Sequence, residues 1–159
     1  MLRKTLLVCG ILSSMLYAAM TVVIAMQWEG YSSASQTISE LSAIGAPTRP
    51  GGTRSDTLHL VLASVTVLLM LLAIGCAASA FGKPFRRYSI ATLAILAAFG
   101  AMTFVEAPRL AANLPTPWLG VWERINIGVF LLWVVVLAVA LLRAEDTAAR
   151  TAGRPALAA

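Results

Sequence analysis

Charged residues are scarce in this sequence, and their scarcity indicates the class of protein. Only 12% of the 159 residues are charged and 59% are hydrophobic, whereas a soluble domain carries about 25% charged residues. The mean hydropathy is +0.83. A core of this size could not remove so much apolar side chain from water. The composition therefore predicts an integral membrane protein, with one compact domain as the default at this length.

Residues and motifs that commonly carry chemistry are also scarce. The chain has one histidine, His59, and two cysteines, Cys9 and Cys76, which lie inside apolar runs. We expect these cysteines to be packing residues rather than a disulfide pair. C-x-x-C pairs, glycine-rich phosphate loops and repeats of 20–50 residues are absent. No motif in the sequence therefore identifies a cofactor or a set of metal ligands.

A formal net charge of +5 does not indicate a nucleic-acid partner here. The cations stand at the ends of apolar runs and do not alternate with aromatic residues. That distribution is typical of membrane topology signals. We therefore expect membrane lipid, and no nucleic acid, as a partner.

Long apolar runs dominate what is present. A spanning helix needs about 20 apolar residues. The first run is longer than the 7–15 residues of a signal peptide, so we predict an uncleaved helix there. We predict an all-α integral membrane four-helix bundle in residues 1–142 and a flexible cytoplasmic tail at 143–159. The predicted spans are about 5–27, 57–81, 88–105 and 120–142.

A polar interval separates the first two spans. Ser33 and Gln36 have the spacing of a capping box, and apolar residues recur after them at helical spacing. Gly45 and Pro47 would end such a helix. We therefore predict a short amphipathic helix over 34–44, lying on the bundle or in the interface plane.

Counting cations orients the chain. Eight lie on the side of the termini and of the 82–88 turn, and four lie on the other side. The positive-inside rule then predicts a multi-pass protein of the cell (inner) membrane with both termini in the cytoplasm. The polar interval and the loop expected at 107–119 would face outward.

This topology brings polar residues together at the outward rim. Ionisable groups near a span are costly and should face the bundle or a wet cavity. They could be helix-end charges, or they could line a pocket that binds or helps move a small polar ligand or a lipid headgroup. The candidate ligand-binding residues are Ser39, Glu40, Asp56, His59, Glu106, Arg109, Glu123, Arg124 and Asn126.

Other functions use the same rim. Asp56 and His59 share a helix face and could act as an acid–base pair for a serine hydrolase. A metalloenzyme could use His59 with carboxylates, but one histidine and scattered acids are a weak signal. An accessory subunit would pack this rim against a larger membrane complex, and a homo-oligomer is also compatible with the pattern.

Two segments resemble a known family. They are Y-S-S-A-S-Q-T-I-S-E-L-S-A at 31–43 and G-V-W-E-R-I-N-I-G at 120–128. With His59, they resemble the bacterial and archaeal membrane family called domain of unknown function 998, which has a "Y-S-x-x-x-x-T-I-S-x-L" segment and a late "G-x-x-E-R" helix start. The resemblance implies no established activity. It points to Ser39, Glu40, His59, Glu123 and Arg124 as residues to test.

Overall fold

Every regular element in the described part of the chain is a helix. The computed structural model describes residues 2–42, 55–111 and 114–152. These residues form the α-helices α1 (Leu2–Gln27), α2 (Ser55–Ala80), α3 (Lys83–Ala111) and α4 (Leu119–Ala152), with a short 3₁₀ helix, η1, at Ser39–Ser42. The prediction of an all-α membrane protein is confirmed.

Three helical stretches are long and apolar enough to cross a bilayer, namely Arg3–Gln27, Lys83–Glu106 and Leu119–Ala148. They coincide with the first, third and fourth predicted spans. α2 occupies the position of the second predicted span, but its described apolar stretch, Ser64–Ala80, is shorter than the other three. That span therefore remains a prediction.

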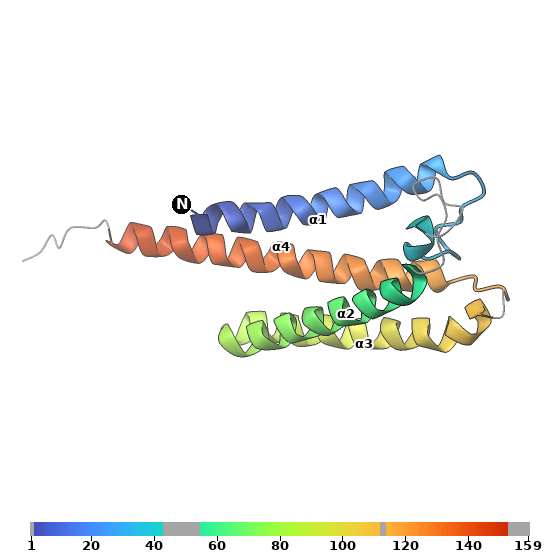
Figure 1. Ribbon diagram of the computed structural model, residues 1–159. Helices are drawn as coiled ribbons and strands as arrows, with labels where there is room; N and C mark the ends of the chain where they lie inside the picture. The colour runs from blue at the N-terminus through green and yellow to red at the C-terminus, as the bar shows by residue number, and fades with distance from the viewer. Residues whose placement is uncertain (1, 43–54, 112–113, 153–159) are drawn as a thin grey trace, which may run out of the picture.

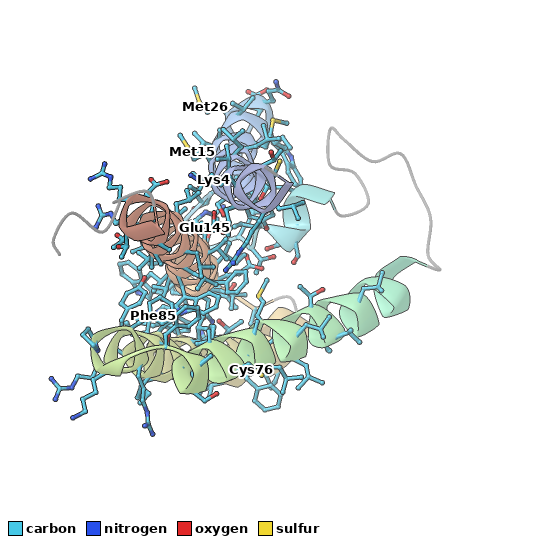
Figure 2. All side chains as sticks on the ribbon, turned by 90° about the vertical axis from the view of Figure 1, so that its left-hand side faces the viewer. Lys4, Met15, Met26, Cys76, Phe85 and Glu145 are labelled. Atoms are coloured by element: carbon cyan, nitrogen blue, oxygen red, sulfur yellow. The ribbon has the colours of Figure 1, made fainter. Side chains whose placement is uncertain are left out.

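The helices form a row in which each packs mainly on its neighbours, in the spatial order α1, α4, α3 and α2. α1 packs mainly on α4, α4 on α3, and α3 on α2. Figure 1 shows α4 between α1 and the α2–α3 pair, and the end view in Figure 2 shows α2 and α3 below α4. Large apolar side chains remain exposed along α1 and α2. A surface this apolar suits contact with lipid tails or other apolar helices.

The best-packed part of the core lies between α2, α3 and α4. Ile74 and Trp133 are 0% and 2% exposed there, together with buried Ala77. The Trp133 indole N–H donates to Ser89 Oγ at 3.0 Å, and Ser89 is itself fully buried. A buried indole usually needs such a partner, so this bond fixes α4 against α3.

Three boundaries differ from the predicted ones. α3 begins at Lys83 rather than 88, because Pro84 is tolerated in a first helical turn. It also continues through Pro108 to Ala111, since a proline this close to the end disturbs only the last turn. α4 continues to Ala152 instead of ending at 142; the chain from 143 onward is rich in alanine, a strong helix former.

Two ion pairs join the C-terminal part of α4 to the first turn of α1. Arg3 lies 2.8 Å from Glu145, and Lys4 lies 2.6 Å from Asp146. Figure 2 shows Lys4 and Glu145 where α1 and α4 meet. A 34-residue helix is about 50 Å long, and the hydrocarbon core is only about 30 Å thick. α4 is therefore longer than the apolar layer is thick, and part of it must lie outside that layer.

The two cysteines are not packing residues. Both are free thiols at exposed positions, Cys9 on α1 and Cys76 on α2. α1 buries only one stripe of side chains against α4, and most of the described α2 side chains are exposed. A position inside an apolar run therefore does not ensure protein contact.

Replacing Ser89 with alanine should destabilise the protein by about 1–2 kcal/mol, because the Trp133 N–H would lose its partner in a buried site. Unfolding in detergent, followed by circular dichroism, measures this loss. Ser79→Ala is the matched control, since Ser79 is exposed and bonds only the Cys76 carbonyl of its own helix. Equal losses in the two variants would contradict the role given to Ser89.

Candidate functional site

The polar segment after α1 begins with a sharp turn. Gly30 has φ = 81°, a left-handed conformation that side chains disfavour. The Tyr31 N–H bonds the Trp28 carbonyl at 3.1 Å, and the two rings stack with centroids 5.5 Å apart. This turn directs residues 31–42, here called the rim segment, back across the end of the bundle (Figure 1).

A capping box organises the second half of the rim segment. The Glu40 carboxylate accepts bonds from the Thr37 N–H and from Thr37 Oγ1 at 2.9 Å. In return, the Glu40 N–H donates to Thr37 Oγ1 at 3.2 Å. The sequence signal is T-x-x-E at 37–40, which our sequence analysis missed. The Glu40 side chain therefore stabilises the turn that begins at Thr37.

The predicted amphipathic α-helix over 34–44 is replaced by shorter structure. A turn occupies 33–35, and η1 is a single 3₁₀ turn at Ser39–Ser42; residues 43 and 44 lie outside the described part. Gln36 does reach back, but its Oε1 caps the Ser32 N–H at 2.8 Å. The chain bends because backbone groups here bond α4 instead of forming a helical ladder.

The Glu123 side chain binds the backbone of the rim segment. Its carboxylate accepts the Ile38 N–H, and its other oxygen lies 3.4 Å from Ser39 Oγ. The residues involved are 84 and 85 positions apart in the chain. Glu123 therefore supplies an acceptor for an N–H group that would otherwise be orphaned at this end of the bundle.

Arg124 makes the densest contacts of the site. Its Nη1 donates to the carbonyls of Ser33 at 2.6 Å, Gln36 at 2.9 Å and Gly120 at 3.0 Å. Its Nη2 donates to the Tyr31 hydroxyl at 2.7 Å. The planar guanidinium presents five N–H donors in a fixed fork, whereas an ammonium has three on one nitrogen. Arg124 is thereby the central donor to the rim segment.

The Tyr31 phenol completes this network. Its hydroxyl reaches the Thr37 carbonyl at 2.7 Å, and its ring lies 5.7 Å from the Arg124 guanidinium carbon. Burial raises the pKa of the Tyr31 phenol, and the hydrogen bond from Arg124 only partly opposes that rise. The phenol therefore stays protonated at neutral pH and can donate to the Thr37 carbonyl.

Gly120 allows α4 to come this close. A Cβ at this position would lie 2.3 Å from the Gln36 carbonyl oxygen and 2.6 Å from that of Ser33. The next residue, Val121, donates its N–H to the Ala34 carbonyl at 3.1 Å. The G-x-x-E-R sequence thus suits contact with the backbone of the rim segment. Gly120 leaves space for it, Glu123 accepts a hydrogen bond from it, and Arg124 donates hydrogen bonds to it.

Glu106 and Arg109 form a separate pair at the same end of the bundle. Glu106 follows Phe99 and Thr103 on α3 at i+7 and i+3, so it lies on the same helix face as these two half-buried residues. Its side chain is 14% exposed and approaches Arg109 Nε at 3.5 Å, whereas the Arg109 side chain is 50% exposed. Glu106 Oε2 is buried and accepts no hydrogen bond. This pair retains bonding capacity that the fold does not use.

Asn126 contacts the backbone of α3. With its amide oriented to give both atoms partners, it donates to the Leu96 carbonyl at 3.1 Å and accepts from the Gly100 N–H at 3.0 Å. Asn126 therefore joins α4 to α3 one turn deeper than Glu123.

The structure brings together only part of the predicted site. Ser39, Glu40, Glu123 and Arg124 meet at the rim segment, while Glu106 with Arg109, and Asn126, lie on the α3 side. Asp56 and His59 are in the first turns of α2, but their side chains lie outside the described part. The other described side chains include no group of three or more metal-binding residues.

Helices with apolar outer faces and a polar rim segment define an integral membrane protein. A family model described as "Protein of unknown function (DUF998)" matches residues 43–140, and the chain belongs to this family. The match includes the G-x-x-E-R segment, whereas the rim segment lies before it. No curated protein and no solved structure matched the chain.

Replacing Gly120 with alanine should displace the rim segment and destabilise the protein by about 1–3 kcal/mol, because two backbone oxygens block the new methyl group. Unfolding in detergent measures the loss. Gly128→Ala is the matched control on the same helix: no atom lies within 4 Å of its Cβ position, so it should be neutral or slightly stabilising. Equal behaviour of the two variants would contradict the close approach.

Arg124→Lys should cost about 1–3 kcal/mol although it preserves the charge, since one ammonium cannot serve the same four acceptors. Cleavage by chymotrypsin at Tyr31 should also become faster as the rim segment loosens. Arg109→Lys is the control, because Arg109 is half exposed and makes only a long ion pair. Unchanged cleavage in Arg124→Lys would argue against this anchoring role.

Proposed function

We propose that this membrane protein binds a small polar ligand or a lipid headgroup at the rim formed by residues 31–42 and the adjoining ends of α3 and α4. The observation that carries the proposal is that Glu106 has a buried carboxylate oxygen without a hydrogen bond. This oxygen, Oε2, has only a long ion pair with Arg109, 3.5 Å from Nε. A buried carboxylate oxygen without a hydrogen bond is costly, and a ligand with an N–H donor would relieve that cost.

Arg109 adds a second recognition element. Its side chain is half exposed and its ion pair with Glu106 is long, so its guanidinium can also meet an anionic group of a ligand. Together, the two side chains match a zwitterion that carries an ammonium and a phosphate. Phosphoethanolamine, free or as a lipid headgroup, is of this class.

Three other described charged residues of the rim, namely Glu40, Glu123 and Arg124, are engaged with the protein backbone. Glu40 and Glu123 both accept hydrogen bonds from the backbone of the rim segment, and Arg124 donates to its carbonyls. These groups build the wall of the site. The proposal therefore assigns direct ligand contact to Glu106 and Arg109.

A second candidate function is that of a subunit in a homo-oligomer or a larger membrane complex. Here the supporting observation is the packing of α1 mainly on α4, which leaves much of its apolar surface exposed. Another helix could cover that surface as well as lipid can. A partner that co-purifies in a fixed ratio would favour this role.

We also propose that the termini lie in the cytoplasm of the cell and that the rim faces outward. The excess of cations on the side of the termini supports this orientation. In addition, Figure 1 shows the N-terminus and the end of α4 at the same end of the molecule, opposite η1.

Glu106→Gln should remove a preference for ethanolamine headgroups. The purified protein is offered phosphatidylethanolamine and phosphatidylcholine with identical acyl chains, and retained lipid is counted by native mass spectrometry. The two headgroups carry the same charges, but only ethanolamine donates N–H bonds. We expect the wild type to favour ethanolamine roughly tenfold, since a charge-assisted bond contributes about 1.5–3 kcal/mol, and the variant to lose this preference.

Glu29→Gln is the control for that experiment, because Glu29 is an exposed acid beside the rim segment. It should keep the wild-type preference. Full competition by free phosphoethanolamine would identify a soluble ligand rather than a lipid. Equal retention of both lipids by the wild type, or an unchanged preference in Glu106→Gln, would refute the assigned contact.

A further inference from the structure

A cluster of cations lies at the opposite end of the molecule from the proposed rim site. Lys83, Arg86 and Arg87 occupy the first turn of α3, just after α2 ends, and all three are exposed. In Figure 1 this turn is at the end of the bundle where the N-terminus lies. We call these three residues the turn cations.

The turn cations lack acidic partners among the described residues. The chain has seven acids, and only Glu145 and Asp146 lie at this end of the molecule. Those two are paired with Arg3 and Lys4 of α1. No described carboxylate lies within 4.0 Å of a turn cation, so three positive charges remain uncompensated at one edge of the helix pair.

Aromatic packing holds this edge in one orientation. The Phe85 ring lies 5.1 Å from that of Phe81 and 6.1 Å from that of Trp133. Figure 2 shows Phe85 on the side of the α2–α3 pair that faces α4. Because the inward face of the first turn is fixed in this way, the turn cations project from the opposite face.

An apolar surface continues directly below the cations. Ile90 follows Arg86 and Arg87 at i+4 and i+3, so it lies on the same face one turn deeper, and it is 51% exposed. The exposed Ala94 continues this stripe. Positive charge at the end of a span with an apolar stripe beneath it matches an anionic headgroup with its acyl chain.

We propose that the turn cations and the α3 stripe below them form a binding site for an anionic phospholipid. The lipid phosphate would contact Lys83, Arg86 and Arg87, and one acyl chain would follow Ile90 toward the middle of the span. This site is independent of the proposed rim site, since it lies at the other end of α3 and uses none of the same residues.

Lipid competition tests this proposal. The full chain, purified in detergent, is offered phosphatidylglycerol and phosphatidylcholine with identical acyl chains, and retained lipid is measured by native mass spectrometry. One cation near an anionic surface contributes about fivefold in binding. We therefore expect the wild type to favour phosphatidylglycerol roughly tenfold, and Arg86→Gln/Arg87→Gln to reduce that preference to about twofold or less.

Arg143→Gln/Arg150→Gln is the charge-matched control. It removes two exposed arginines from the same end of the molecule, near Glu145 and Asp146, and should keep most of the preference. Thermal unfolding verifies that both variants are folded. Equal retention of the two lipids by the wild type, equal losses in the two variants, or displacement of the lipid by inorganic phosphate would each overturn the proposal.

Discussion

The architecture depends on the recognition of the rim-segment backbone by the first turns of α4. A chain that crosses the end of a membrane bundle must give partners to its N–H and C=O groups where water is limited. Arg124 and Glu123 provide those partners, and Gly120 allows α4 to approach. Since α4 also packs on both α1 and α3, this contact joins the rim segment to the centre of the bundle.

This role explains why the most conspicuous charged residues of the sequence are not the best candidates for ligand contact. Charged groups in or near a span need partners, and Glu40, Glu123 and Arg124 find theirs in the protein backbone. Two groups of charged side chains keep hydrogen-bonding capacity that no described protein partner uses. They are the Glu106–Arg109 pair at one end of the molecule and the turn cations at the other.

The two ends of the molecule therefore differ in how charge is balanced. At the end where α1 begins and α4 ends, the acids of α4 pair with the cations of α1 and leave the turn between α2 and α3 positive. At the rim, acids and an arginine bond the backbone. The apolar outer faces between these ends suit lipid, so both proposed sites lie where protein, headgroups and water meet.

The sequence by itself determined the class of protein, the helical fold and the approximate positions of the four long helices, because these follow from local hydropathy and from residues close together in the chain. It also placed Glu123 and Arg124 at a helix start. Only the tertiary structure decided what they bind, since the Arg124 partners Tyr31 and Gln36 are 93 and 88 positions away. The same long-range bonding replaced the helix expected at 34–44 with a turn and η1, because carbonyls and N–H groups that would have formed a helical ladder are bonded to α4.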